Sequence, residues 1–111
     1  MAWISLTSEA QLEEIVSKSA QKPQVIFKHS TRCSISGVAQ QRLQKAKFPE
    51  EIDFYYLDLL AYRSISNLIA ERFHVHHESP QVLVIKDGKC VYDESHLAIS
   101  VDEILEQSNV A

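Results

Sequence analysis

Cys33 is the residue of this sequence whose type and position most clearly permit chemistry. It follows the apolar run 25–27 and a short polar turn, and it stands where a helix is expected to begin. Unpaired N–H groups and the dipole at a helix N-terminus favour the thiolate and lower the pKa of a cysteine placed there. Arg32 and Lys28 add positive charge nearby. We therefore predict that Cys33 is a reactive nucleophile, the alternative being a buried and inert thiol.

Ser36 occupies the position where a dithiol oxidoreductase would carry its second cysteine, so the segment reads C-x-x-S. Disulfide chemistry at Cys33 must therefore begin with one thiol. The thiolate would attack a mixed disulfide, release the client thiol and keep the small thiol until a second small thiol removes it. The Ser36 hydroxyl could donate a hydrogen bond to that thiolate from the first turn of the helix. A helix serine bonded to its own main chain is an equally good interpretation.

Arg32 and Thr31 directly precede Cys33 and are candidates for tuning its thiolate. Arg32 would act through its positive charge, which favours the ionised sulfur. Thr31 would act through its hydroxyl, although threonine in such a turn, like Ser30, is also a typical turn former or helix cap.

Alternating strand and helix patterns predict elements in the order βαβαβαββα to position these residues. The expected strands cover residues 3–6, 25–29, 52–57, 81–85 and 90–92, and the expected helices cover 8–20, 33–46, 64–73 and a terminal segment from 100. We expect three serines to cap helices and one pair to form a tight hairpin turn: Ser8 with Gln11, Ser64, Ser100 with Glu103, and Asp87-Gly88. Four side chains of helix 33–46 are expected to be buried: Val38, Ala39, Leu43 and Ala46.

This order predicts an α/β fold with a mixed central sheet flanked by helices. Strands joined by helices form a parallel layer, and the hairpin adds antiparallel strands. Sites in such sheets form beyond the carboxyl ends of the strands, which is where strand 25–29 leads to Cys33. We expect the 111 residues to form one domain over 1–111.

Charge and hydropathy exclude several classes of partner. The net charge of −4 at pH 7 argues against nucleic acid and anionic membranes, because both reward clustered lysine and arginine. No apolar run approaches the roughly 20 residues that span a bilayer, and the first residues do not resemble a signal peptide. We therefore expect a cytoplasmic protein without a membrane or nucleic-acid partner.

Three motifs in the same order resemble the bacillithiol-system monothiol bacilliredoxin-like (YtxJ-type) family of the thioredoxin-like superfamily. They are FKHSTRCSIS at 27–36, HESPQ at 77–81 and SHLAIS at 95–100. The resemblance implies a thioredoxin-like fold and a cytosolic protein that removes bacillithiol, or a similar low-molecular-weight thiol, from S-thiolated client proteins. Cys33 would be its nucleophile, and no bound cofactor or metal would be required. Ser34 departs from the proline that is common in this family.

The same resemblance assigns roles around Pro80. It implies a cis-proline that faces Cys33, and it makes Ser79 and Pro80 candidates for contact with the backbone of an extended substrate. His77, in the HESPQ motif, and His96, after the last strand, could stabilise the thiolate when protonated or carry a proton to the leaving thiol. An ordinary structural histidine is the alternative for both.

The remaining histidines and the second cysteine receive simpler interpretations. His74, His76 and His77 suggest a metal site by type, but their spacing fits no zinc pattern, so we expect a solvated loop. Cys90 could be a resolving thiol. Because it belongs to a predicted hairpin strand, we expect it to be buried away from Cys33 and not to form a disulfide.

Two other functions remain open on the same fold. One is an arsenate-reductase-like enzyme, which would need further arginines to hold the oxyanion; the chain has only Arg32, Arg42, Arg63 and Arg72. The other is a non-catalytic module that binds peptides in the groove around Pro80. A binding module has no reason to keep Cys33 ionised, so the state of this thiol distinguishes the two classes.

Overall fold

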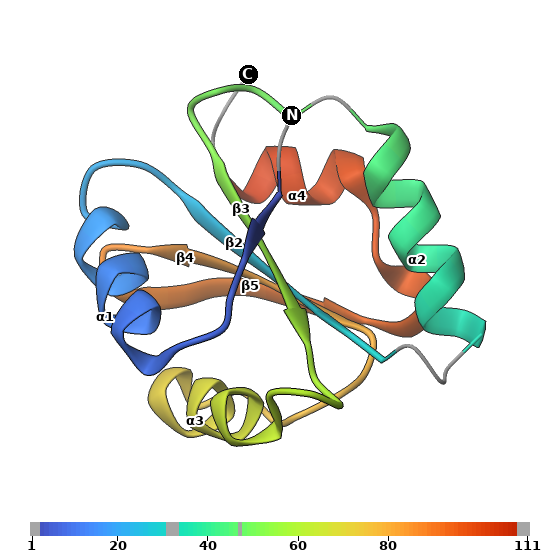
Figure 1. Cartoon of the computed structure of the whole chain (residues 1–111). Coiled ribbons are helices and arrows are strands. Elements are labelled where there is room, and N and C mark those ends of the chain that lie inside the picture. Colours follow the sequence, from blue (N-terminus) through green and yellow to red (C-terminus); the bar gives the residue numbers. More distant parts are fainter. Residues whose placement is uncertain (1–2, 31–33, 47, 109–111) are drawn as a thin grey trace.

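The computed structural model describes residues 3–30, 34–46 and 48–108. Its strands are β1 (Ile4–Ser5), β2 (Gln24–His29), β3 (Asp53–Asp58), β4 (Gln81–Lys86) and β5 (Lys89–Ser95). Its helices are α1 (Glu9–Lys18), α2 (Ser34–Lys45), α3 (Arg63–Phe73), a short 3₁₀ turn η1 (His96–Ala98) and α4 (Val101–Gln107). This is the predicted order of elements, with η1 added before the last helix (Figure 1).

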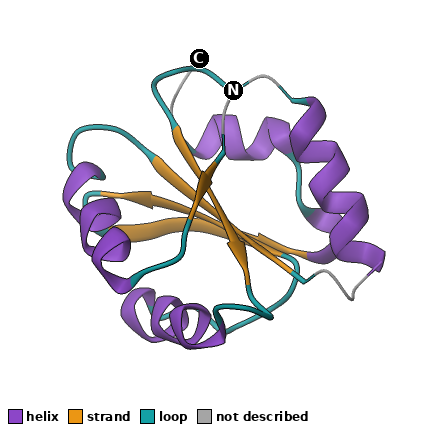
Figure 2. Cartoon of the chain, in the orientation of Figure 1, coloured by secondary structure: helices purple, strands orange, loops and turns teal. Residues whose placement is uncertain are grey.

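The five strands form one mixed sheet in the order β1-β3-β2-β4-β5. β3 pairs in parallel with β1 and β2, whereas β4 is antiparallel to β2 and to β5. Figure 2 shows the strands crossing the middle of the molecule with helices on both sides. β2 is the central strand and is buried along its whole length, as the continuous apolar run predicted.

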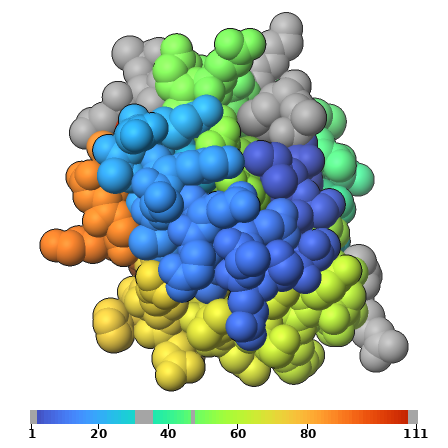
Figure 3. All heavy atoms as spheres, turned by 60° about the vertical axis from the view of Figure 1, so that its left-hand side comes forward, coloured from blue at the N-terminus to red at the C-terminus, as the bar shows by residue number. Residues whose placement is uncertain are grey.

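Two apolar clusters fill the two sides of the sheet. One lies under α1 and α3 and includes Ile26, and the other lies under α2 and α4 and includes Phe27. Figure 3 shows α1 and α3 covering their face as one continuous surface. Because side chains alternate along a strand, the next two residues of β2, Lys28 and His29, are also directed to opposite faces.

The helix caps agree with the sequence in two of three places. Ser8 and Gln11 form a reciprocal capping box, and the Ser100 side chain accepts a hydrogen bond from the Glu103 N–H. The prediction for Ser64 is wrong: α3 begins at Arg63 with Tyr62 as its N-cap. The N–H groups of both Ile65 and Ser66 already donate to the Tyr62 carbonyl, so the helical bonding starts before Ser64.

The buried stripe of α2 also differs from the prediction at Val38 and at Ala46, which follows the end of the helix and is only partly buried. Ser36, Ala39 and Leu43 are buried, but Val38 is 47% exposed. These three buried residues follow the helical spacing of three and four, and Val38 lies outside the stripe that they define.

The β4–β5 hairpin has the predicted tight turn. Asp87 and Gly88 both have positive φ, at 52° and 75°, as a type I′ turn requires. Their N–H groups donate to the Ser19 carbonyl and hydroxyl at 2.8 Å each, which fastens the hairpin to the end of α1. Among the described residues, no helix is long and apolar enough to cross a membrane.

Candidate functional site

The predicted site lies where β2 leads into α2, and the structure describes its frame. Cys33, Thr31 and Arg32 lie outside the described residues, so their predicted roles remain predictions. The frame consists of the end of β2, the first turn of α2, the loop 74–80 before β4 and the turn η1.

Ser36 joins the end of β2 to the first turn of α2. Its side chain is fully buried, and its hydroxyl oxygen accepts the Ser30 N–H at 3.0 Å. The same oxygen lies 2.7 Å from Nδ1 of His29. Ser36 thus fixes both ends of the segment that carries Cys33. Its role toward the thiolate remains a prediction.

The tautomer of His29 decides whether the Ser36 hydrogen is available. If Nδ1 is unprotonated, the hydroxyl must donate to it and has no hydrogen left. If Nδ1 carries the hydrogen, His29 donates to Ser36, and the hydroxyl hydrogen is free for another acceptor. A hydrogen bond from Ser36 to a thiolate therefore requires the Nδ1–H tautomer of His29, a partner that the sequence analysis did not identify.

His29 is held in an aromatic and largely dry environment. It is 4% exposed, and its ring centroid lies 5.8 Å from that of Phe27 and 5.6 Å from that of Tyr56. Burial lowers the pKa of His29, and the negative charge of Asp58, its neighbour in the sheet register, partly opposes this. The neutral imidazole is therefore favoured at neutral pH.

Lys28 occupies the opposite face of the same strand end. Its side chain is fully buried, and its Nζ donates to the Ser66 carbonyl at 3.1 Å and lies 3.3 Å from Nδ1 of His77. Burial lowers the pKa of Lys28 to about 8. Among the described residues, no carboxylate lies within ion-pair distance of this amine. A buried amine without an acidic partner is unusual, because burial of an unpaired charge is costly.

His77 connects Lys28 to the loop before Pro80. Its Nδ1 lies 3.3 Å from both the Lys28 amine and the Ser66 hydroxyl. Burial lowers the pKa of His77, the charges of Lys28 and Arg63 lower it further, and Glu78 opposes them. These shifts disfavour the protonated imidazole that we considered as a stabiliser of the thiolate. A role of His77 in carrying a proton stays a prediction.

The loop before β4 has the cis-proline that the resemblance implied; that this proline faces Cys33 remains a prediction, because Cys33 lies outside the described residues. The Ser79–Pro80 peptide bond is cis, and Pro80 is buried. Nε2 of Gln81 donates to the His76 carbonyl at 2.9 Å, which holds the loop from the start of β4. The Ser79 hydroxyl is buried without a hydrogen-bond partner among the described residues. Contact of Ser79 and Pro80 with a substrate remains a prediction.

His96 lies next to this loop. Its N–H donates to the Pro80 carbonyl at 3.0 Å, and its φ of 58° is in the left-handed region. Its imidazole is half exposed, with Nε2 3.9 Å from a Glu78 carboxylate oxygen. Arg42 of α2 donates to the carbonyls of Leu97 and Ile99 at 3.3 and 2.9 Å, so η1 is fastened to the helix that follows Cys33.

Cys90 and His74 belong to a different part of the molecule. Both line a cavity of about 360 Å³ near the start of β5, together with Arg72, Phe73, Gly88 and Lys89. This part of β5 pairs with the end of β4, which lies beside the beginning of β2 and not beside its carboxyl end. Burial raises the pKa of the Cys90 thiol to about 11, which agrees with an unreactive thiol.

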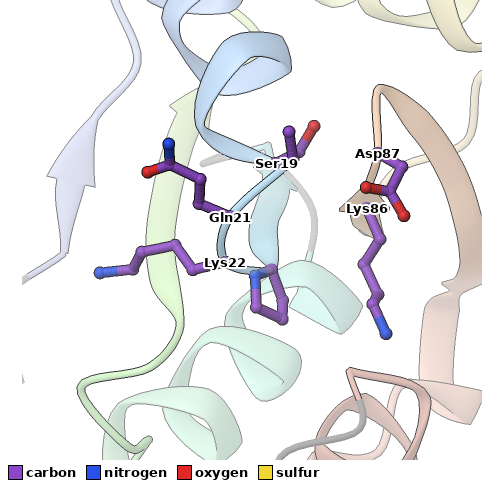
Figure 4. Close-up of a pocket in the computed structure, with 7 residues that line it drawn as sticks. Ser19, Gln21, Lys22, Lys86 and Asp87 are labelled. Atoms are coloured by element: carbon purple, nitrogen blue, oxygen red, sulfur yellow. The ribbon is translucent and has the colours of Figure 1, made fainter.

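Two further cavities lie at opposite ends of the sheet. The one in Figure 4, of about 100 Å³, is lined by Ser19, Ala20, Gln21, Lys22, Pro23, Lys86 and Asp87 and precedes β2. The other, of about 160 Å³, is lined by Ser5, Leu6, Thr7, Tyr56, Asp58 and Tyr62 at the carboxyl ends of β1 and β3. Of the three cavities described here among residues 3–30, 34–46 and 48–108, this second one shares an end of the sheet with His29. In the part of the chain that the structure describes, no three metal-ligating side chains cluster.

Comparisons with known proteins identify the family and the fold of this chain. The chain matches the protein family described as monothiol bacilliredoxin BrxC over residues 4–104. It is similar to a solved structure with a thioredoxin fold, at 33% identity and a TM-score of 0.81, over 96% of this chain and 92% of the other. It is also similar to thioredoxin of Malassezia sympodialis (16% identity, TM-score 0.74, 96% and 91% covered) and of Fasciola hepatica (20%, 0.72, 96% and 96%). The predicted thioredoxin-like α/β fold is confirmed.

Proposed function

Because this chain belongs to the monothiol bacilliredoxin family, we propose that it is a one-thiol oxidoreductase acting on mixed disulfides between client proteins and bacillithiol or a similar small thiol. The observation that supports this most is the position of Ser36. The position of a resolving cysteine carries a buried hydroxyl that is bonded to His29 and Ser30 and cannot form a disulfide. Cys33 would therefore hold the small thiol until an external thiol removes it.

The exchange needs no external oxidant or reductant in its first step. The Cys33 thiolate attacks the sulfur of the small thiol, and the disulfide to the client breaks. The client leaves as a thiolate and takes a proton from solvent. A second small thiolate then attacks the adduct on Cys33, which regenerates the Cys33 thiolate and forms a symmetrical disulfide of the small thiol.

Some of the surrounding residues would bind the client, and others would favour the ionised form of Cys33. The backbone of Ser79 and Pro80 would contact the extended client. Arg32 and Thr31 would favour the thiolate, and His96 would stand beside the bound disulfide from η1. We expect the reaction to take place in the cytoplasm, where a free thiol stays reduced. It requires neither a metal nor a bound cofactor.

Transfer of a bacillithiol adduct tests this proposal. The wild type and the Cys33→Ala variant would be incubated with a bacillithiolated client, and both proteins followed by intact mass. We expect the wild type to gain one adduct as the client is freed, and Cys33→Ala to gain none. Cys90→Ala is the matched control and should react like the wild type. If the client stays modified in the presence of the wild type, the proposed function is wrong for this thiol.

A further inference from the structure

The buried Lys28 amine joins three elements that are far apart in sequence. It belongs to β2, its carbonyl partner Ser66 is in α3, and its imidazole partner His77 is in the loop before Pro80. These partners are 38 and 49 residues away along the chain. The amine therefore ties the strand that leads to Cys33 to the loop that is expected to hold the substrate.

The chemistry of an ammonium group restricts the state of His77. A lysine ammonium has three hydrogens to donate and no lone pair, so the ring nitrogen beside it must accept. Nδ1 of His77 is then unprotonated, and the imidazole hydrogen is on Nε2. The Ser66 hydroxyl approaches the same Nδ1 at 3.3 Å and can donate to it as well. Nε2–H is left as the one polar group of this ring that these contacts do not occupy.

We propose that Lys28 is a positioning residue for the exchange reaction, because it holds His77 as a neutral imidazole whose Nε2 hydrogen is available to the bound mixed disulfide. The role of this donor rests on the proposed function. The group that would accept it is a carbonyl or carboxylate oxygen of the thiolated client or small thiol. Lys28 itself is fully buried and does not touch the substrate.

The charged groups around His77 support this assignment. Arg63 on α3 and His76 in the loop act with Lys28 against protonation of the ring, and Glu78 acts against them. A second positive charge on His77 would lie 3.3 Å from the fully buried Lys28 amine, which is unfavourable. Above a pH of about 8, the neutral lysine amine can accept as well as donate, and the restriction on the tautomer is relaxed.

Ring-nitrogen NMR of His77 tests the proposal directly. In the wild type at pH 7, the shifts should show an unprotonated Nδ1 and a protonated Nε2. In Lys28→Met, which keeps the length and apolar volume of the side chain, the signal should move toward a mixture of tautomers, and the pKa of His77 should rise. Lys22→Met removes a lysine near the opposite end of β2 and is the matched control, with no expected change at His77. A His77 hydrogen on Nδ1 in the wild type, or an unchanged tautomer in Lys28→Met, would overturn the proposal.

Rates of adduct transfer then show whether Lys28 influences the reaction through His77. Lys28→Met should slow adduct transfer about fivefold, the effect of losing one neutral hydrogen bond in the transition state. In a His77→Gln background, the same lysine substitution should cause little further loss. Equal losses in both backgrounds would mean that Lys28 does not act through His77. Absence of transfer in the wild type would instead contradict the proposed function, while the NMR result would stand independently.

Discussion

Two adjacent titratable residues of β2, Lys28 and His29, have different kinds of hydrogen-bond partner on the two faces of the strand. On the α2 face, His29 bonds to Ser36, seven residues further along the chain and on the other side of Cys33 in the sequence. On the α3 face, Lys28 reaches Ser66 and His77, which are distant in sequence. The first network fixes the first turn of α2, which follows Cys33 in the sequence, and the second holds the loop that is expected to receive the substrate. One strand end would thus orient both partners of the proposed reaction.

The largest expected difference between the faces is the effect of pH on stability. The pKa of Lys28 falls from 10.5 to about 8 on folding, so the unfolded chain binds more protons between these values. The contribution of Lys28 to the free energy of unfolding should therefore rise with pH across that window, by about 3 kcal/mol. Urea unfolding of the wild type and Lys28→Met from pH 7 to 10.5 measures it. The difference isolates Lys28, because Cys90 and Tyr55, whose pKa values are raised to about 11 and 12, are present in both proteins.

A flat difference between these two proteins across the window would mean that Lys28 ionises as it does in solvent. Burial on the α3 face would then not shift the pKa of Lys28, and the two faces would not differ in this respect. Near pH 7, Lys28→Met should be at least as stable as the wild type, since replacing a buried charge by an apolar side chain is often neutral or stabilising.

The second expected effect concerns the α2 face. Ser36→Ala leaves the Ser30 N–H and the His29 ring without their shared partner in a buried place. We expect a loss of about 2 kcal/mol in the free energy of unfolding, which urea denaturation would measure. Ser64→Ala, an exposed serine in the first turn of α3, controls for the change in helix propensity. A loss no larger than that of Ser64→Ala would show that Ser36 does not fasten the strand to the helix.

The smallest expected effect concerns the corresponding serine on the α3 face. Ser66→Ala removes one hydroxyl contact at 3.3 Å, but the carbonyl that accepts from Lys28 belongs to the main chain and remains. The expected loss is about 0.5 kcal/mol in the same urea assay. If Ser66→Ala cost as much as Ser36→Ala, the two faces would depend equally on their serines, against the difference described above.

The sequence predicted most of the fold because its signals are local. The capping box at Ser8 and the Asp87-Gly88 hairpin each depend on residues within a few positions of one another. Two features were missed. The exposure of Val38 depends on tertiary packing, and the start of α3 at Arg63 depends on hydrogen bonds to the Tyr62 carbonyl.

The site was predicted less completely. The C-x-x-S motif drew attention to Ser36 and to Cys33, which lies outside the described residues, but not to His29. His29 is the last residue of β2 and meets Ser36 only when α2 folds back over the strand end. The charge of Lys28 was visible in the sequence. Its partners were not, since they depend on which residues of α3 and the proline loop reach the same face of β2.

The central claim is that Cys33 is the one-thiol nucleophile, and its reactivity relative to Cys90 tests this most directly. Both cysteines of the wild type would be alkylated with iodoacetamide at pH 7, and each site quantified by peptide mass over time. Burial raises the pKa of Cys90 to about 11, so we expect this thiol to react slowly while Cys33 is modified at least about a hundredfold faster. Comparable rates at the two sites, or faster modification of Cys90, would contradict the account.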